Sequence, residues 1–312
     1  MISVVIPLYN EEEVLTETHA RLSAVMRSVG EAYELIFVND GSRDKTPEIA
    51  AGLCEKDPHA RLISFSRNFG HQIAITAGMD YAVGDAVILI DADLQDPPEL
   101  IPEMIKKWKE GYHVVYGKRI KRNGETAFKK FTAKLYYRFL RRMTDVNIPT
   151  DTGDFRLMDR KVCEAMKKLG ERNRYVRGLV SWVGFRQYGL EYIREERFAG
   201  KTKYPLKKML RLAMDGITSF SNKPLKLATY MGFFLSGLSF IYLLVVLSQK
   251  LFGYPTAWGW ASLLAVQLFF NGVMLIMLGI IGTYIGRIYE ESKGRPLYIV
   301  REEIGFSKKD EN

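Results

Sequence analysis

The stretch that decides the fold is AVILIDADLQDPPEL, residues 86–100. Its first five residues are apolar and are typical of a strand that is buried on both faces of a parallel sheet. Three carboxylates, Asp91, Asp93 and Asp96, follow within six positions. Because a buried carboxylate is costly unless a positive group faces it, this strand end predicts a bound cation or a basic partner.

Apolar runs recur along the first half of the chain, at residues 3–9, 34–40, 61–66, 86–90 and 113–117. Each run has the length and composition of a strand, and amphipathic helices are expected between them. This alternation predicts an α/β fold with a Rossmann-like, mostly parallel sheet flanked by helices. Ligands of such folds bind beyond the carboxyl ends of the strands.

Three helix starts are expected from capping residues, one of them at Thr46, which precedes Pro47. Asn10, with Glu13 three positions later, matches the capping-box pattern, so the first helix should begin there. Asp96 precedes two prolines, which favour the first turn of a helix, and it is interpreted as the cap of the next helix. The candidate binding site at this strand end then consists of Asp91, Asp93 and Gln95.

Polar side chains follow the ends of all five strands, which predicts a lined cleft. They are Tyr9, Asn10, Glu11, Asn39, Asp40, Ser66, Arg67, Asn68, Asp91, Asp93, Gln95, Lys118 and Arg119. Any one of them alone is common in a turn. Asp91 and Asp93 are alternate residues, which share one face of an extended chain, and Gln95 adds a carbonyl oxygen. Such hard oxygen ligands suit Mg²⁺ or Mn²⁺, and an ion held there neutralises the diphosphate of a nucleotide leaving group.

Composition narrows the class of partner. The formal net charge is +9, which favours anionic partners or surfaces. The two cysteines match no metal or redox spacing. The sequence contains neither G-x-x-x-x-G-K-[ST] nor G-x-G-x-x-G, which argues against phosphate-loop kinases and dinucleotide oxidoreductases. A basic, aromatic-rich segment at residues 128–143 is interpreted as a helix on an anionic membrane surface in preference to a nucleic-acid contact.

Two stretches, residues 227–247 and 251–286, contain no charged residue. Each has the length of about 20 residues that a helix needs to cross a bilayer. The alternative is two buried helices of a soluble bundle, but such helices usually keep a polar stripe. Basic residues flank the outer sides of the two stretches, so both termini are expected to be cytoplasmic at the cell (inner) membrane. Glycines within the stretches allow close helix contact and favour a homo-oligomer.

The sequence therefore divides into four parts. They are a cytosolic α/β domain at residues 1–203, an amphipathic juxtamembrane helix at 204–226, a transmembrane helix hairpin at 227–286 and a cytosolic tail at 287–312.

Several ordered motifs carry a family resemblance. VVIPLYNEE, VNDGSRDKT, SRNFGHQIAITAGMDYA and DADLQDPPE resemble the catalytic domain of glycosyltransferase family 2, which has the GT-A fold. DTGDFRLMDR, RGLVSWVGF and RFAGKTKYPLKKM, followed by two apolar stretches, are similar to polyprenyl-phosphate glycosyltransferases, such as bacterial undecaprenyl-phosphate glucosyltransferases and dolichol-phosphate mannosyltransferase. The resemblance covers essentially the whole chain and is specific for the class but not for the sugar.

The resemblance also implies roles for particular residues. It implies nucleotide binding by Pro7, Tyr9, Asn10, Glu11 and Asp40, binding of metal and diphosphate by Asp91, Asp93 and Gln95, catalysis by Asp154 as a general base, and binding of the acceptor phosphate by Arg119 and Lys203. Asp151 is the nearby alternative to Asp154. His71 is interpreted as a structural histidine, with a contact to the donor as the alternative. The loop arginines Arg172, Arg174 and Arg177 receive no individual role.

The implied reaction is transfer, with inversion, of a hexose from a nucleotide sugar to a polyprenyl (undecaprenyl) phosphate on the cytoplasmic membrane face. Glucose from UDP-glucose is the first choice; mannose, N-acetylglucosamine and aminoarabinose are the alternatives. A phosphate monoester has a second pKa of about 6, so a base has little proton to remove and Asp154 can act by orienting the acceptor. A processive polysaccharide synthase would carry Q-x-x-R-W, which does not occur. The intact carboxylates argue against a non-catalytic membrane scaffold.

Overall fold

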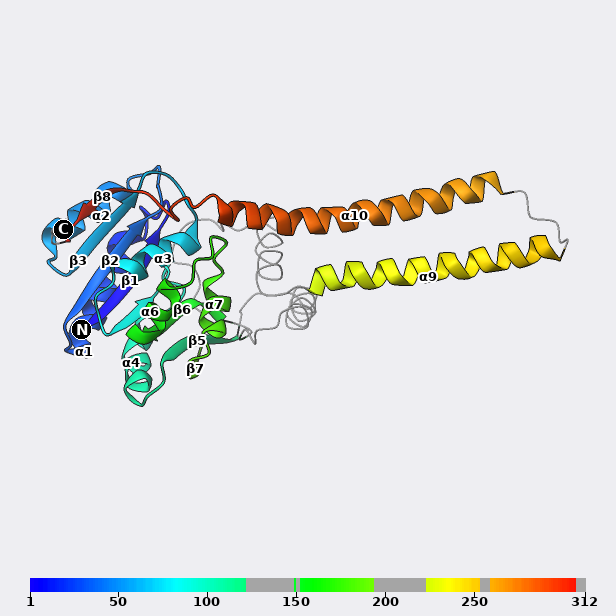
Figure 1. Ribbon diagram of the computed structural model, residues 1–312. Coiled ribbons are helices and arrows are strands. Elements are labelled where there is room, and N and C mark those ends of the chain that lie inside the picture. Colours follow the sequence, from blue (N-terminus) through cyan, green and yellow to red (C-terminus); the bar gives the residue numbers. More distant parts are fainter. Residues whose placement is uncertain (122–148, 150–151, 194–222, 253–258, 307–312) are drawn as a thin grey trace.

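The computed structural model describes residues 1–121, 149, 152–193, 223–252 and 259–306. This part of the chain forms an α/β domain and two long helices that project from it (Figure 1). Four predictions fall outside the described residues: the role of Lys203, Asp151 as the alternative base, residues 204–222 of the expected juxtamembrane helix, and the basic segment at 128–143.

The sheet of the domain has eight strands in the described residues, in the order β7-β5-β6-β4-β1-β2-β3-β8. They are β1 (Ile2–Leu8), β2 (Tyr33–Asn39), β3 (Ala60–Phe65), β4 (Ala86–Leu89), β5 (Val114–Lys121), β6 (Thr152–Asp159), β7 (Gln187–Ile193) and β8 (Val300–Ile304). β1 pairs in parallel with β2 and β4, β2 with β3, and β5 with β7, whereas β6 and β8 run antiparallel to their neighbours. The predicted α/β fold with a mostly parallel sheet is confirmed.

Helices cover both faces of the sheet. One face carries α1 (Leu15–Val29), α2 (Thr46–Lys56) and, after the 3-10 turn η1 (Pro98–Leu100), α4 (Ile101–Lys109); the other carries α3 (His71–Tyr81), α6 (Arg160–Lys167) and α7 (Val176–Trp182). Side chains of β1 enter the two cores in turn, Val4 and Ile6 on the first face and Val5 on the second. Because both faces are covered, the central strands are apolar throughout, which makes them recognisable in the sequence.

α2 begins at Thr46 as expected, but the predicted helix starts at Asn10 and Asp96 are wrong. α1 begins further along the chain, and Asn10 has a left-handed backbone with a φ of 54°. Its side chain accepts the backbone N–H of Arg43 at 2.8 Å, so it joins two loops. The turn after Asp96 has no side-chain cap, because the fully buried Asp96 carboxylate accepts hydrogen bonds from Arg119 and Tyr192. In both cases the side chain bonds to a residue distant in the sequence instead of capping the helix that follows it.

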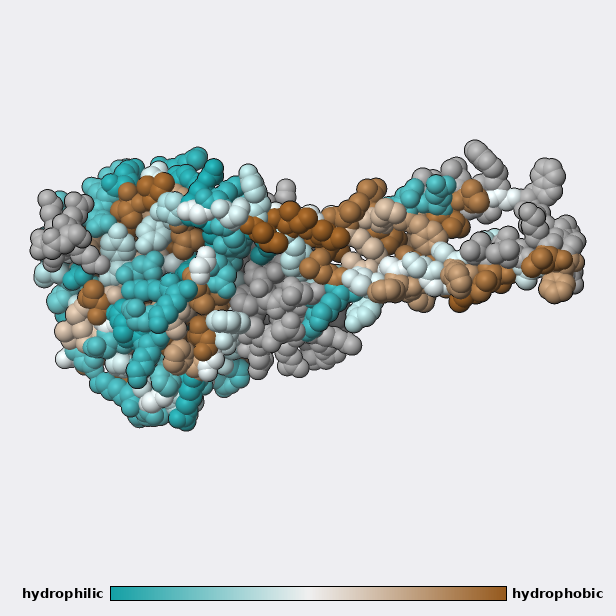
Figure 2. Space-filling model, viewed as in Figure 1, coloured by the Kyte–Doolittle hydropathy of each residue, from teal (hydrophilic) through white to brown (hydrophobic). Residues whose placement is uncertain are grey.

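The helices α9 (Lys223–Leu251) and α10 (Trp260–Ser292) lie side by side and leave the domain together (Figure 1). Both contain a segment long and apolar enough to cross a membrane, of 20 residues in α9 and 24 residues in α10. Only 6% of the first segment and none of the second is buried, so they are not the core of a soluble bundle. Figure 2 shows brown, apolar side chains along these helices and a largely teal domain. Such surfaces are typical of proteins associated with membranes.

The chain returns to the sheet after α10. This helix runs to Ser292, beyond the expected end of the span at residue 286. β8 then pairs antiparallel with β3 at the edge of the sheet. Residues 287–312 are expected to form a cytosolic tail, and residues 300–304 instead complete the sheet. Pairing of this strand satisfies the backbone groups that β3 would otherwise expose.

Candidate active site

The carboxyl ends of β1, β2, β3 and β4 lie at one edge of the sheet because these strands are parallel. Pro7, near the end of β1, lies at this edge. β6 runs antiparallel to β4 and therefore brings its first residues to the same edge. Leu89, at the end of β4, pairs with Arg156 of β6. Continuing this register by two residues places Asp91 beside Asp154, although the two residues are far apart in the sequence.

Hydrogen bonds join the loops after β1 and β2. The backbone N–H of Asn10 donates to Ser42 Oγ at 3.0 Å, and that of Glu11 donates to Thr46 Oγ1 at 2.8 Å. Tyr9, immediately before them, is 37% exposed. The second loop therefore holds in place the residues that were predicted to bind nucleotide at the first strand end.

Asp40 joins the loops after β2 and β3. Its carboxylate accepts the backbone N–H of Phe69 at 2.6 Å and that of Gly70 at 3.0 Å. Burial raises the pKa of Asp40, and these two N–H groups oppose the rise. The loops lie so close that a Cβ on Gly41 would be 2.5 Å from the carbonyl carbon of Arg67. The resemblance implies a nucleotide contact for Asp40, and its visible partners are backbone groups of the neighbouring loop.

The chain turns sharply after β4. Residues 92–94 form a turn in which Leu94 has a φ of 55°, a value that is uncommon outside glycine. Asp93 Oδ1 accepts the backbone N–H of Gln95 at 3.1 Å. The expectation that Asp91 and Asp93 belong to an extended chain is therefore wrong, because the Asp93 side chain stabilises a turn. The two carboxylates nevertheless lie close enough for Asp93 to influence the pKa of Asp91.

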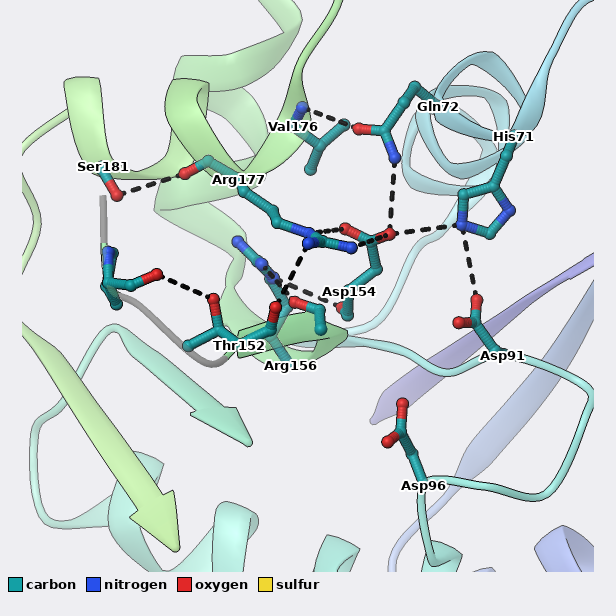
Figure 3. Close-up of polar contacts among 12 residues, drawn as sticks. His71, Gln72, Asp91, Asp96, Thr152, Asp154, Arg156, Val176, Arg177 and Ser181 are labelled. Carbon is teal, nitrogen blue, oxygen red and sulfur yellow. Dashed lines mark hydrogen bonds and ion pairs between the residues drawn. The ribbon is translucent and has the colours of Figure 1, made fainter. Parts of the chain in front are cut away.

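Three side chains hold Asp154 (Figure 3). Arg177 donates from Nε to Oδ1 at 2.8 Å and from Nη2 to Oδ2 at 3.0 Å, which is a bidentate pair. Gln72 Nε2 and His71 Nε2 each lie 3.4 Å from Oδ2. Burial acts to raise the pKa of Asp154, which is 5% exposed, but Arg177 and His71 hold this pKa well below its usual range. Asp154 is therefore ionised at neutral pH.

His71 lies between two of the predicted site carboxylates (Figure 3). Its Nε2 is 3.4 Å from Asp91 Oδ1 and 3.4 Å from Asp154 Oδ2. Burial acts to lower the pKa of His71, but Asp91 and Asp154 raise it to about 9. His71 is the first residue of α3, and the start of this helix brings it to the sheet edge. The structure places His71 in the site as a positive group that faces the strand end of β4.

Arg119 is paired within the site. Its Nη2 lies 3.3 Å from Asp96 Oδ1, and its Nε donates to the Tyr192 hydroxyl at 3.0 Å. A Cβ on Gly153, the residue before Asp154, would lie 2.3 Å from Arg119 Nη2. The guanidinium group therefore packs against the backbone next to Asp154, and its visible partner is a carboxylate of the site.

Asp91 lies near three other carboxylates, those of Asp93, Asp96 and Asp154. Burial raises the pKa of Asp91 to about 6, and three nearby carboxylates add to the rise, whereas His71 opposes it. A divalent cation with oxygen ligands would offset this charge, so Asp91 and Asp93 fit the predicted Mg²⁺ or Mn²⁺. Among the residues that the structure describes, no three His, Cys, Asp or Glu side chains form a complete metal site. Further ligands would come from Gln95, substrate or water.

The sequence prediction missed the three side chains that hold Asp154. His71 and Gln72 had a usable signal, because they follow a glycine just after a strand end that had been assigned to the cleft. Arg177 had no such signal. It is one of three arginines within residues 172–177, and their spacing does not tell which of them faces the site. In the structure the position of Arg177 in the first turn of α7 directs it to Asp154.

The chain is similar to known glycosyltransferases over most of its length. The family model described as "Glycosyl transferase family 2" matches residues 3–166. "Uncharacterized glycosyltransferase YkcC" of Bacillus subtilis (strain 168) is 63% identical over 307 residues, which cover 98% of this chain and 95% of the relative. "Bactoprenol glucosyl transferase" of Shigella phage SfV is 44% identical over 303 residues, which cover 97% of this chain and 98% of the relative.

Solved structures show a more distant likeness. Glucosyl-3-phosphoglycerate synthase from Mycobacterium tuberculosis, in complex with Mn²⁺, uridine diphosphate and phosphoglyceric acid, is 22% identical to this chain. The match covers 70% of this chain and 76% of that one, with a TM-score of 0.47. The family match and the near full-length similarity to the bacterial and phage proteins agree with the arrangement of the site, and the protein therefore belongs to glycosyltransferase family 2 and is a glycosyltransferase.

Proposed function

We propose that this protein transfers glucose, with inversion, from UDP-glucose to a polyprenyl (undecaprenyl) phosphate on the cytoplasmic face of the cell membrane. The observation that carries the proposal is the set of Asp91, His71 and Asp154 at the sheet edge, in a chain that also has two apolar helices of membrane-spanning length. A relative that is 44% identical is named bactoprenol glucosyl transferase, and this name supports both the sugar and the lipid.

Asp91, Asp93 and Gln95 hold Mg²⁺ or Mn²⁺ in this proposal. The bound ion supplies positive charge that neutralises the diphosphate of the leaving nucleotide. Burial raises the pKa of Asp91 to about 6, with help from neighbouring carboxylates, so a cation at this position relieves their repulsion. Asp93 also fixes the turn through its hydrogen bond from the backbone of Gln95.

Asp154 orients the acceptor more than it deprotonates it. Burial acts to raise its pKa, but Arg177 and His71 keep the pKa low, which makes Asp154 a weak base. The acceptor phosphate monoester has a second pKa of about 6, so it arrives largely ionised and has little proton to give. The positive charges of Arg177 and His71 also reduce the repulsion between the Asp154 carboxylate and an incoming phosphate.

The remaining site residues keep the roles that the resemblance implies. Pro7, Tyr9, Asn10, Glu11 and Asp40 bind the nucleotide, and Arg119 and Lys203 bind the acceptor phosphate. The exposed ring of Tyr9 supports this assignment, because a base can stack on it. Asp40 contributes by fixing the loop that begins at Arg67, through its bonds to backbone N–H groups.

The membrane arrangement follows from the two ends of the helix hairpin. The α/β domain precedes α9, and β8 follows α10 and pairs with β3 of the same domain. Both ends of the hairpin therefore reach one sheet, which supports an even number of crossings. With the basic flanks on the cytoplasmic side, the protein is a multi-pass membrane protein whose termini are both cytoplasmic. Anionic lipid and a second copy of the chain are its further partners, and nucleic acid is not.

A transfer assay tests the proposal. Purified full-length protein is incubated with undecaprenyl phosphate, Mg²⁺ or Mn²⁺, and radiolabelled UDP-glucose. The expected product is a labelled lipid that enters the organic phase and releases its sugar in mild acid. GDP-mannose and UDP-N-acetylglucosamine are the comparison donors. Faster transfer from either of them would show that the transferred sugar is mannose or N-acetylglucosamine and not glucose. If no donor labels the lipid with wild-type protein, the proposed reaction is wrong.

A further inference from the structure

Residues 291–306, which are the last two residues of α10 and the stretch that follows, run across the domain from the end of the membrane helix to β8 (Figure 1). We call these residues the C-terminal segment. Protection of the β3 edge explains the pairing of β8. It does not explain the contacts that the segment makes with the end of α3 and with the connection that leads into α7. These are the helices whose side chains hold Asp154.

The first contact is with the connection between α6 and α7. Glu291, at the end of α10, accepts the backbone N–H of Arg172 at 2.8 Å through Oε1. In return, the Arg172 guanidinium group donates to the carbonyl oxygen of Arg295. Arg172 lies five residues before Arg177, which forms the bidentate pair with Asp154. The end of the membrane helix therefore fixes the loop from which α7 begins.

The second contact is with the end of α3. The Tyr298 hydroxyl donates to Asp80 at 3.2 Å, and the Tyr298 ring stacks on Phe65 with centroids 5.1 Å apart. The neighbouring Tyr81 donates to Glu303. Asp80 and Tyr81 are the last two residues of α3, the helix that begins with His71 and Gln72. The C-terminal segment thus holds one end of the helix whose other end lies in the active site.

The two braced helices meet at the catalytic carboxylate. Gln72 of α3 accepts the backbone N–H of Val176 of α7 at 2.9 Å, and its amide nitrogen lies 3.4 Å from Asp154 (Figure 3). Arg177 contacts the same carboxylate from α7. A displacement of either helix would move donors away from Asp154, because both of its oxygens are held by side chains of α3 and α7.

We propose that the C-terminal segment is a positioning element for Asp154 and makes the geometry of the active site depend on the cytosolic end of α10. The proposal rests on the proposed function, since it explains how Asp154 is held in the position from which it orients the acceptor. Its residues touch no atom of substrate; they act through α3 and α7. Loss of the contact between α10 and the α7 connection should therefore lower kcat and leave the KM for UDP-glucose nearly unchanged.

The test uses the full-length double variant Glu291→Ala/Arg172→Ala. Glu291 is exposed and Arg172 is only half-buried, so the fold should persist. We expect kcat for glucose transfer to fall about tenfold and KM for UDP-glucose to change less than about twofold. Hydrogen–deuterium exchange should rise in peptides that cover residues 176–182. Arg172→Lys, which keeps a donor for the Arg295 carbonyl, should retain most of kcat. The matched control is Glu290→Ala, an exposed α10 residue paired with Lys293 at 2.5 Å, which should change neither quantity.

The exchange measurement separates this proposal from the proposed function. If wild-type protein transfers no glucose but exchange in residues 176–182 still rises in the double variant, the proposed reaction is wrong and the positioning role stands. Wild-type kcat in the double variant would overturn the positioning role. So would a fall in kcat without increased exchange, because the loss would then not pass through α7.

Discussion

Two parts of the active site are built in different ways. The loop wall comprises residues 9–12, 40–46 and 67–70, and the charged cluster comprises His71, Asp91, Asp93, Asp154 and Arg177. Bonds from backbone N–H groups to side chains hold the loop wall, such as Gly70 to Asp40. Ion pairs between side chains hold the charged cluster. The backbone hydrogen bonds fix the shape of the loops, whereas the ion pairs fix the positions of the charged groups. Substitutions in the cluster should therefore change turnover, and those in the wall should change donor affinity and stability.

The largest effect is expected from Asp93→Asn. The substitution removes one of the negative charges that would hold the cation, and turnover should fall by about three orders of magnitude. Glucose transfer to undecaprenyl phosphate, measured over a range of Mn²⁺ concentrations, gives the value. Asp85→Asn is the matched control, because this exposed carboxylate pairs with the amino terminus at 2.7 Å, and it should keep normal turnover. Near-normal transfer by Asp93→Asn at low Mn²⁺ would contradict the assignment.

Asp154→Asn should come next. The amide keeps the size of the side chain but removes the charge that pairs with Arg177 and His71, so turnover should fall by about two orders of magnitude. Binding of UDP-glucose should remain within about threefold, since the donor is bound mainly by the loop wall. Titration calorimetry with Mn²⁺ and UDP-glucose, beside the transfer assay, measures both. Normal turnover would move the orienting role to Asp151 or to the acceptor itself.

Arg177→Gln should move the acidic limb of the pH profile to higher pH than in the wild-type protein. Arg177 helps to hold the pKa of Asp154 below its ordinary value, so in the wild type the ionised form is lost only at pH values below that range. Without Arg177, burial raises the pKa of Asp154, and activity that needs the carboxylate should be lost at a higher pH than in the wild type. The kcat/KM profile at saturating Mn²⁺ measures this acidic limb.

The control for Arg177→Gln is Arg21→Gln. It makes the same change of charge at a residue of α1 that pairs with Glu99 at 2.8 Å, on the other face of the sheet. Its profile should match the wild type. If the profile of Arg177→Gln were also unchanged, His71 alone would keep Asp154 ionised. The bidentate pair with Arg177 would then contribute little to the low pKa of Asp154.

The sequence predicted what is local and missed what is brought together by the fold. The run at residues 86–90 predicted β4, because a strand covered on both faces must be apolar along its length. β8, with the sequence VREEI, carries no such signal, since it only borders β3 and its polar side chains lie at the sheet edge. Arg177 could not be chosen among its neighbouring arginines, because the register of α7 decides which one reaches Asp154. The capping prediction at Asn10 failed because its side chain bonds to a distant loop.

Asp40→Asn should have the smallest effect on turnover, and it tests the loop wall directly. An Asn side chain can keep the bonds from Phe69 and Gly70 that Oδ1 accepts, but its amide nitrogen would replace Oδ2 and face the N–H of Gly70, which is also a donor. The free energy of unfolding should fall by about 1–2 kcal/mol, and the KM for UDP-glucose should rise about fivefold as the loop shifts. Denaturant unfolding and the transfer assay measure the two. If kcat fell as far as in Asp154→Asn, the negative charge of Asp40 would itself be needed for turnover. Asp40 would then belong with the charged cluster.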